Sequence, residues 1–362
     1  MIAVVKIGTS SITDVNGAID DAAVEKLCAE VEQQRMLGHE IVVVTSGAIA
    51  AGLPAIGLGK RPSDLATLQA VSAIGQHRLM RTWDDHLSRH GAVAGQVLLA
   101  PLDFVHRQQY LHARQTLTRL LELGVVPVVN ENDAIADDEI RFGDNDRLAA
   151  LVAHLVRAEL LVLLTDTPGL LTSDPRLDAG ASLIEEIIEV DHQMEQVAGG
   201  TGSARGSGGM ASKLAAAKIA AWSGVRAVIA AADRPGVLAG AIAGEPGIGT
   251  IVRPHDRRLS ARKLWIAFAV GSSGTIVVDD GARRALVERA TSLLPAGVVD
   301  VIGSFDQEDA VEIADSHGRV FAKGLVRHAA LRVKEWAGRR SGDLPADLAH
   351  EVVHRDDLVV LQ

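Results

Sequence analysis

Two lysines stand where each could bind a phosphate group. Lys6 begins the segment Lys6-Ile-Gly-Thr-Ser10, which directly follows an apolar run. Lys213 ends the segment Gly206-Ser-Gly-Gly-Met-Ala-Ser-Lys213, which opens a helical pattern. Glycines at the start of a helix leave backbone N–H groups and the positive end of the helix dipole open to an anion. We therefore predict a phosphate-binding loop at residues 207–213. Lys6 offers a further cation, although a strand-end lysine can also extend to water without any binding role.

The same glycines partly fit the fingerprint of a dinucleotide site. They read G-x-G-x-x-A from Gly206, and Asp233 lies beyond the next strand pattern. That fingerprint requires a strand directly before the glycines, whereas residues 199–205 read as a polar loop. A Walker A loop is excluded because Gly-Lys-[Ser/Thr] does not occur in the sequence. The glycine-rich segment is therefore interpreted as a flexible phosphate-binding loop, and not as the dinucleotide site of a nicotinamide dehydrogenase.

Asparagine and aspartate gather in two neighbouring segments, Asn130-Glu-Asn-Asp133 and Gly143-Asp-Asn-Asp146. Such clusters can hold an ammonium group, or bind magnesium through water. The alternative is a run of Asx turns in which Asp144 caps a helix. Two clusters so close together favour a binding function.

Hydroxyl residues follow two further strand patterns. In Thr45-Ser-Gly-Ala48, Gly47 permits a close backbone approach and Ser46 can hydrogen-bond a substrate or cap a helix. Thr165 and Asp166 precede a Pro-Gly pair, so they could receive a nucleotide or begin a turn.

The elements that must position these residues form an alternating pattern. Short apolar runs without polar alternation are typical of strands buried on both faces. Such runs occupy residues 2–7, 40–44, 91–99, 125–129, 160–164 and 227–231. Helical patterns at residues 24–31, 63–87 and 107–123 lie between them. Residues 1–253 are therefore predicted to form a three-layer α/β/α domain with a mainly parallel sheet, in which ligands bind at the carboxyl ends of the strands.

A second domain is expected after a polar, basic linker at residues 254–272. Short strand patterns with turn residues between them predict a small β-rich domain over residues 273–362. The predicted strands are at residues 275–278, 298–302, 310–313, 320–322 and 358–361, and the predicted helices at 282–294, 329–337 and 345–350.

Composition excludes several classes of protein. A chain of 362 residues with a net charge of −10 has no general attraction to nucleic acid or to anionic membranes. No run is long and apolar enough for a membrane span. Cys28 is the only cysteine, which excludes an intrachain disulfide and a cysteine-based zinc site and suggests the cytoplasm. Zinc-protease and serine-hydrolase motifs are absent from the sequence.

Taken together, the motifs and their order resemble the amino acid kinase family over almost the whole chain. The resemblance rests on Val5-Lys-Ile-Gly-Thr-Ser10, Val44-Thr-Ser-Gly-Ala-Ile-Ala-Ala-Gly52, Val129-Asn-Glu-Asn-Asp133, Phe142-Gly-Asp-Asn-Asp146, Leu164-Thr-Asp166, Ser173-Asp-Pro-Arg176 and Gly208-Gly-Met-Ala-Ser-Lys213. The second domain resembles a PUA domain in Ser292-Leu-Leu-Pro-Ala-Gly-Val298, Val301-Ile-Gly-Ser-Phe305 and Val353-His-Arg-Asp-Asp357.

The resemblance implies ATP-dependent phosphorylation of the side-chain carboxylate of L-glutamate to L-glutamyl 5-phosphate, the first step of proline biosynthesis. The implied catalytic residues are Lys6, Lys213 and Asp146. The implied glutamate-binding residues are Ser46, Gly47, Asp133 and Asn145. ATP is expected to bind at Lys6, Gly8, Thr165, Asp166, Ser207, Gly208, Gly209, Met210, Ala211, Ser212 and Lys213. Magnesium is expected to be held mainly through ATP, near Asp146, without a direct protein site.

Elementary chemistry agrees with this implied reaction. A carboxylate is already ionised at neutral pH, so a carboxylate nucleophile needs no general base. Two lysines and Mg²⁺ can offset the charge on ATP and on the nucleophile, which would otherwise repel each other. Aspartate, N-acetylglutamate, carbamate or UMP stay open as alternative substrates within the family.

The resemblance also implies a homo-oligomer, either a dimer or a tetramer, with L-proline as a feedback inhibitor. An RNA-binding module is the competing class, because PUA domains often bind RNA. Residues 271–362 hold 15 acidic and 11 basic side chains, and a net-negative domain lacks the electrostatic drive for RNA binding unless its cations cluster. RNA is therefore not an expected partner.

Overall fold

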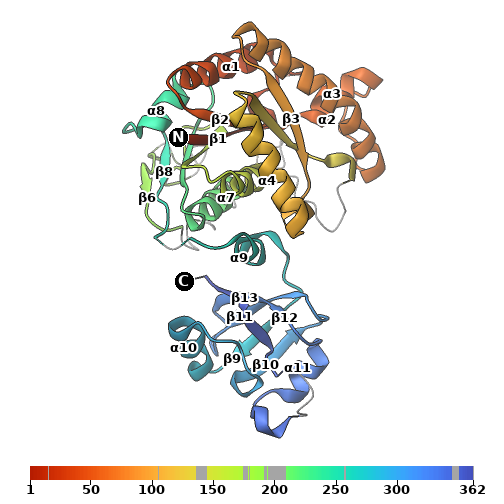
Figure 1. The fold of residues 1–362 in the computed structure, drawn as a ribbon, viewed down its shortest axis with the longest axis vertical. Coiled ribbons are helices and arrows are strands. Elements are labelled where there is room, and N and C mark those ends of the chain that lie inside the picture. Colours follow the sequence, from red (N-terminus) through yellow and green to blue (C-terminus); the bar gives the residue numbers. More distant parts are fainter. Residues whose placement is uncertain are drawn as a thin grey trace. The chain divides into compact units, whose positions relative to one another are not determined.

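The computed structural model describes residues 1–14, 16–104, 106–135, 145–173, 178, 180–190, 194, 209–256, 258–344 and 350–361. The chain divides into two compact units, Met1–Arg258 and Leu259–Gln362 (Figure 1). The division falls inside the stretch expected to be a linker. None of the helices in the described ranges is long and apolar enough to cross a membrane.

Unit 1 is built on one sheet with the strand order β3-β4-β2-β1-β5-β7-β8-β6. All neighbouring strands are parallel except β7 and β8, which confirms a mainly parallel sheet. The strands are β1 (Ile2–Ile7), β2 (Glu40–Val44), β3 (Ala94–Leu99), β4 (Val126–Glu131), β5 (Leu160–Thr165), β6 (Glu186–Ile187), β7 (Arg226–Ala231) and β8 (Thr250–Val252). All six strands expected in this unit are present. The sequence did not indicate β6 and β8, which are too short to give a pattern.

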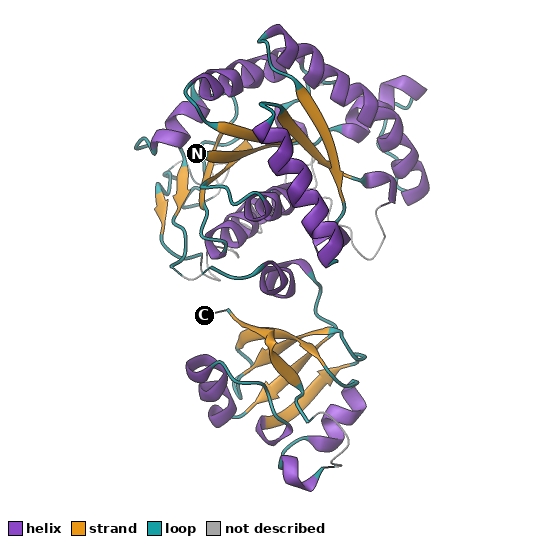
Figure 2. Ribbon diagram, in the orientation of Figure 1, coloured by secondary structure: helices purple, strands orange, loops and turns teal. Residues whose placement is uncertain are grey.

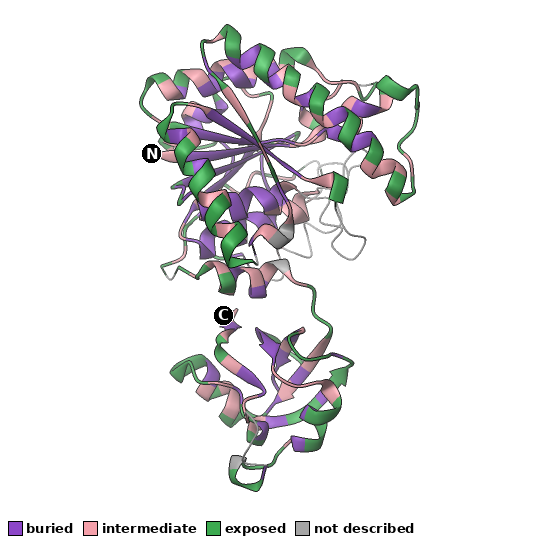
Figure 3. Cartoon of the chain, turned by 45° about the vertical axis from the view of Figure 1, so that its right-hand side comes forward, coloured by how far each residue is buried: buried purple, intermediate pink, exposed green. Residues whose placement is uncertain are grey.

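Helices cover both faces of this sheet, and Figures 2 and 3 show the buried strands between the two helical layers. The helices are α1 (Asp21–Met36), α2 (Ala48–Gly52), α3 (Leu65–Arg89), α4 (Arg107–Glu122), α5 (Asn145–Leu155), α7 (Met210–Trp222) and α8 (Val237–Ala243). Short 3₁₀ turns are η1 (Thr9–Ser11), η2 (Leu53–Ile56), η3 (Pro101–Phe104) and η4 (Asp133–Ile135). The three-layer architecture is thereby confirmed.

Side chains alternate along β1, and this alternation determines which face of the sheet each one points to. Ala3, Val5 and Ile7 belong to the core that also contains side chains of α1, α3 and α8. Successive strand residues point to opposite faces, so Val4 and Lys6 point the other way. That face is covered by α5, which contacts β1 and packs against α7. Lys6 is therefore directed toward α5 and α7 by strand geometry alone.

Burial on both faces, predicted for each of the six apolar runs that form strands of this sheet, is wrong for β3. The central strands β4 and β5 are buried at every position, but only Leu99 is buried in β3. The physical reason is that β3 lies at the edge of the sheet, where fewer elements cover it.

Unit 2 is a small β-rich unit with a sheet in the order β10-β9-β11-β12-β13. Only β9 and β11 pair in parallel. Its elements are α9 (Ala261–Leu264), the π-helical turn η6 (Trp265–Ala269), β9 (Gly274–Val278), α10 (Asp280–Arg289), η7 (Pro295–Gly297), β10 (Val298–Gly303), β11 (Ala310–Ala314), β12 (Val320–Val326), α11 (Ala330–Trp336), η8 (Ser341–Asp343) and β13 (Val353–Val360). The five expected strands are present, and α9 and η6 lie against β12 and β13.

The helix predicted at residues 282–294 ends earlier than expected. Helix α10 stops at Arg289 because Ala290 adopts the left-handed conformation, with φ of 48°. Leu293 then donates its N–H to the carbonyl of Val353, 2.9 Å away, so this segment pairs with the sheet instead of continuing the helix. The helix predicted at 345–350 lies outside the described residues except for its last residue.

Helices α2 and α3 meet through two glycines that allow their backbones to touch. A Cβ atom at Gly75 would lie 1.7 Å from the Ala48 carbonyl oxygen, and one at Gly52 would lie 2.1 Å from the Val71 carbonyl oxygen. Real Cβ atoms do not approach backbone atoms so closely, so glycine is required at both positions.

We expect Gly75→Ala to separate α2 from α3 and to destabilise unit 1 by about 1–3 kcal/mol, the usual cost of overpacking. The change should also raise the KM of the amino acid that is expected to bind at Ser46 and Gly47, because α2 directly follows these residues. Urea unfolding and steady-state kinetics measure the two effects. Gly59→Ala is the control, since a Cβ atom there meets no other atom within 4 Å. Equal behaviour of the two variants would contradict this account of the α2–α3 contact.

Candidate active site

The carboxyl ends of β1, β2, β4 and β5 meet at one edge of the sheet, because these four strands run in parallel. Lys6 pairs with Val44 in the register of β1 and β2, and Ile7 pairs with Leu164 of β5. The order of the strands reverses at β1: β2 and β4 lie on one side of β1, and β5 and β7 lie on the other. Ligands of open α/β sheets bind at such a point.

One cluster on this edge joins three elements that are distant in sequence. Asp146, at the start of α5, forms salt bridges with Lys6 of β1 and Lys213 of α7. The Lys213 ammonium lies 3.3 Å from Oδ2 of Asp146. The Ser212 hydroxyl donates to the same oxygen over 2.7 Å. The three residues predicted as catalytic therefore meet in space, and all three are buried.

Electrostatics keeps this cluster ionised and positive. Burial alone would raise the pKa of Asp146, but the charges of Lys6 and Lys213 and the Ser212 hydrogen bond lower the pKa to about 2. Two ammonium groups around one carboxylate leave an excess positive charge in a buried place, where charge interacts strongly. A Cβ atom at Gly8 would lie 3.5 Å from the Lys6 ammonium, so the backbone passes close to this cation. The arrangement can accept an anion such as a phosphate.

Helix α7 brings a second anion-binding feature to the cluster. Gly209 is its N-cap residue, and no side chain among the described residues caps the helix. The first N–H groups of a helix have no partner within the helix and can bind an anion. Met210, Ala211 and Ser212 form the first turn. Ser207 and Gly208, predicted to belong to the same loop, lie outside the described residues.

Four residues predicted to bind the amino acid line one cavity of about 320 Å³. They are Ser46, Gly47, Asp133 and Asn145, from the ends of β2 and β4 and the start of α5. Gly47 has φ of 102° and is the N-cap residue of α2, so this position is favourable only for glycine and Ser46 does not cap the helix.

Asn145 connects the strand ends around this cavity. Its side-chain amide lies within hydrogen-bond distance of Ser46 Oγ (2.8 Å), the Thr45 carbonyl (3.0 Å) and Asn130 Oδ1 (3.1 Å). The amide has only two hydrogens, so these three acceptors share them. Its own Oδ1 atom is buried without a hydrogen-bond partner among the described residues. An unpaired buried acceptor at a cavity can receive a hydrogen bond from a donor group of a ligand.

Side chains of α3 form hydrogen bonds with residues that line the cavity, which the sequence did not indicate. Ser72 donates to Asp133 over 2.7 Å, and Gln76 accepts a hydrogen bond from Asn130 over 2.7 Å. Burial raises the pKa of Asp133, against the opposing effects of the Ser72 hydrogen bond and the positive charge of Arg61. The available signal was the four-residue spacing of Ser72 and Gln76 beside the apolar stripe of α3, which places both on one face.

Thr165 and Asp166 line a separate cavity of about 410 Å³ between β1, β5 and the start of α1. The Thr165 hydroxyl donates to the Asp166 carboxylate over 3.2 Å. This cavity shares Thr13 with the cavity of about 320 Å³, which we call the amino-acid cavity after the residues predicted to bind there. The predicted site residues that the structure describes thus fall into three places, namely the lysine cluster with the start of α7 and the two cavities.

Both units of the chain are similar to known protein families. The amino acid kinase family model matches residues 1–231, and the PUA domain model matches residues 274–346. Glutamate 5-kinase of Rhodococcus opacus is 45% identical over 358 residues, covering 99% of this chain and 96% of that protein. The proteins of the same name from Nocardia farcinica (44% identical, covering 98% of this chain and 96% of theirs) and Pelobacter propionicus (42%, covering 99% and 97%) are similar over the same extent.

Proposed function

The chain belongs to the amino acid kinase family, and from that premise we propose that it phosphorylates the side-chain carboxylate of L-glutamate with ATP. The product is L-glutamyl 5-phosphate, and the reaction is the first step of proline biosynthesis. One observation carries the proposal: Asn145 lines the amino-acid cavity, and the next residue, Asp146, holds Lys6 and Lys213. A carboxylate at the inner end of the cavity is thereby directed toward two cations.

The chemistry requires positioning and charge neutralisation. The glutamate carboxylate attacks the terminal phosphorus of ATP, and the bond from that phosphorus to the bridging oxygen of ADP breaks. Lys6 and Lys213 offset the negative charge that brings these groups together. Asp146 holds the two lysines in position. Backbone N–H groups at the start of α7 receive phosphate oxygens, and Gly8, Thr165 and Asp166 complete the nucleotide site.

Magnesium fits this site as part of the nucleotide complex. It prefers oxygen ligands and is commonly held by substrate phosphates with one or two carboxylates. No group of three or more His, Cys, Asp or Glu side chains stands ready to hold an ion within the described ranges. The oxygens of Asp146 are engaged by Lys6, Lys213 and Ser212. We therefore expect ATP to supply most of the ligands, and the bound ion to offset charge on the transferred phosphoryl group.

A substrate panel tests the proposed function. ADP release is measured with ATP, Mg²⁺ and one acceptor at a time, namely glutamate, aspartate, N-acetylglutamate, carbamate and UMP. We expect glutamate to give the highest kcat/KM by a wide margin over a reaction without acceptor. A higher value with any other acceptor would refute the assignment of glutamate.

The two halves of the site should respond separately to mutation. We expect Asp133→Ala and Asn145→Ala to raise the KM of glutamate about 10- to 100-fold, the effect of one hydrogen bond to a charged group, and to leave the KM of ATP nearly unchanged. Steady-state kinetics with each substrate varied in turn measures both constants. An increase confined to the KM of ATP would mean that the two halves are exchanged.

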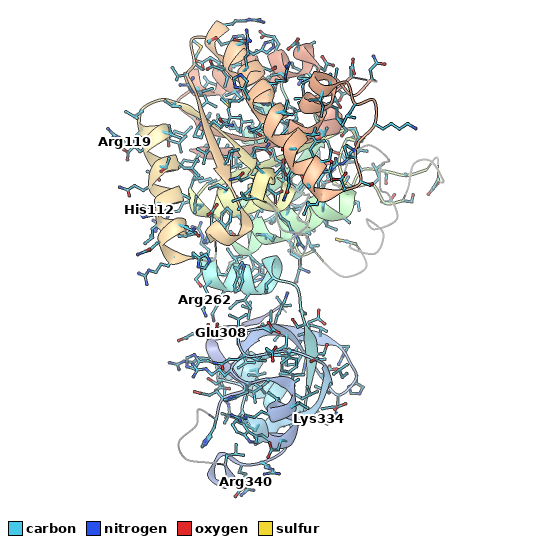
Figure 4. All side chains as sticks on the ribbon, turned by 90° about the vertical axis from the view of Figure 1, so that its right-hand side faces the viewer. His112, Arg119, Arg262, Glu308, Lys334 and Arg340 are labelled. Carbon is cyan, nitrogen blue, oxygen red and sulfur yellow. The ribbon has the colours of Figure 1, made fainter. Side chains whose placement is uncertain are left out.

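Unit 2 contributes none of these groups, so we propose that it is dispensable for chemistry and serves regulation or assembly. Two of its cations, Arg262 and Arg340, lie at opposite ends of the unit (Figure 4), and Arg262 pairs with Asp357 over 2.7 Å. Poor RNA binding thus stays the prediction. Oligomerisation as a dimer or tetramer, inhibition by L-proline and a cytoplasmic location also stay predictions.

Removing residues 273–362 should leave glutamate kinase activity measurable, with altered inhibition or oligomeric state. The comparison is kcat/KM of the truncated and full-length chains, with circular dichroism to verify folding. A folded truncated protein without activity would contradict the proposed dispensability. Salt-sensitive, submicromolar binding of the full-length chain to a structured RNA, lost on truncation, would contradict the prediction about RNA.

A further inference from the structure

The amino-acid cavity has an unusual charge balance for a substrate with two carboxylates. Three acidic side chains line it: Asp14, Glu131 and Asp133. Arg61 is the only lysine or arginine among the described residues that line it. Acidic groups suit an ammonium group but repel a carboxylate. Among the described residues that line the cavity, Arg61 is therefore the one that offers a second carboxylate a positive charge, while the hydroxyl and amide side chains there offer only neutral donors.

The direction of the substrate decides which carboxylate Arg61 meets. Phosphoryl transfer requires the side-chain carboxylate of glutamate to face the cluster of Lys6 and Lys213, and these lysines do not line the cavity. The α-ammonium and α-carboxylate must then lie at the far end. These two groups share one carbon atom, so the side chains that bind them must be neighbours. Asp133 and Arg61 meet this condition, because both line the same cavity of about 320 Å³ and the charge of Arg61 reaches the Asp133 carboxylate.

The surroundings of Arg61 also suit it to bind a carboxylate. It lies between η2 and α3, is exposed, and forms no salt bridge with any other described residue. Pro62 follows it, and Asp64 caps α3 by accepting the Thr67 N–H over 2.8 Å, which anchors the chain just after Arg61. A guanidinium group can bind both oxygens of a carboxylate through two parallel hydrogen bonds. We infer that Arg61 binds the α-carboxylate of the amino acid substrate, an inference that rests on the proposed function.

A substrate analogue without the α-carboxylate tests this role of Arg61. L-Isoglutamine keeps the side-chain carboxylate of glutamate but has an uncharged amide in place of the α-carboxylate. We expect Arg61→Gln to raise the KM of glutamate about 10- to 100-fold, with kcat and the KM of ATP within about twofold of the parent. The same substitution should change kinetics with isoglutamine less than about threefold, so the preference for glutamate shrinks. Lys60→Gln, which removes an adjacent cation outside the cavity lining, should change neither substrate's kinetics.

Two results would overturn the inference: an unchanged KM of glutamate in Arg61→Gln, or equal losses with glutamate and isoglutamine. Binding of L-glutamate measured by calorimetry, without ATP, separates this inference from the proposed function. If the parent protein binds glutamate but does not phosphorylate it, the proposed function fails, and weakened binding in Arg61→Gln but not in Lys60→Gln still supports the role of Arg61. If the parent protein neither binds nor phosphorylates glutamate, both fail.

Discussion

Replacing Lys213 with methionine is expected to lower kcat about 100- to 1,000-fold, the usual cost of removing one group that stabilises charge in a transition state. Methionine keeps the bulk of the buried side chain, and Asp146 keeps its salt bridge with Lys6. The fold should therefore remain intact, which circular dichroism and thermal unfolding can verify. Lys6→Met should lower kcat to a similar extent, because Lys6 of β1 contacts the same Asp146 carboxylate as Lys213 of α7.

A matched control exists on the same helix. Lys218 lies further along α7, away from Asp146, so Lys218→Met should keep kcat within about twofold of the parent. If Lys213→Met has near-normal kcat, Lys213 takes no part in the mechanism. If both variants lose activity equally, the loss reflects damage to α7 and not the loss of a charge at the active site.

The second large effect is expected at Asp146. Asp146→Asn leaves the ammonium groups of Lys6 and Lys213 buried without their carboxylate, and breaking a buried ion pair in this way costs about 3–5 kcal/mol of unfolding free energy. Amide hydrogen exchange of peptides from unit 1, measured across a urea series, gives this free energy without interference from unit 2. Asp84→Asn, an exposed change on α3, should alter it by less than about 0.5 kcal/mol.

The pH dependence of this contribution follows from the direction of the pKa shift. The folded pKa of Asp146, about 2, lies below the ordinary value of 3.8. The ionised carboxylate therefore stabilises the fold fully above pH 3.8, and the stabilisation is lost as the pH falls through about 2. We expect the difference in stability between the parent and Asp146→Asn to be constant from pH 6 to 8. A difference that declines already across this range would show that Asp146 titrates near neutrality.

Elements with a continuous apolar pattern could be predicted closely from the sequence. The strands expected at residues 2–7 and 40–44 match β1 and β2 residue for residue, because Gly8 follows the first run and the polar residues His39 and Thr45 flank the second. The start of α1 also depends on local sequence, since Asp20 caps the helix by accepting hydrogen bonds from the N–H groups of Ala22 and Ala23. These features depend on neighbours in the chain, which the sequence contains directly.

Residue types at the ends of these elements indicated the site, but spacing could not show which of them meet. Lys213 and Asp146 are 67 residues apart, and their contact depends on α5 packing against α7. Ser72 and Gln76 were overlooked because their helix is otherwise explained by its apolar stripe. Arg61 follows no strand, so only the path of the chain between η2 and α3 places it at the cavity. Tertiary packing brings these distant residues together, and local sequence patterns do not show how elements pack.

Formation of an acyl phosphate is the direct test of the proposed reaction. Acyl phosphates react with hydroxylamine to give stable hydroxamates, so the enzyme is incubated with L-glutamate, ATP, Mg²⁺ and hydroxylamine, and the product is identified by mass spectrometry. The predicted result is the hydroxamate of the glutamate side chain, formed in equal amount to ADP and absent without ATP. ADP formed without any hydroxamate, or a hydroxamate at the α-carboxyl group, would contradict phosphorylation of the side-chain carboxylate.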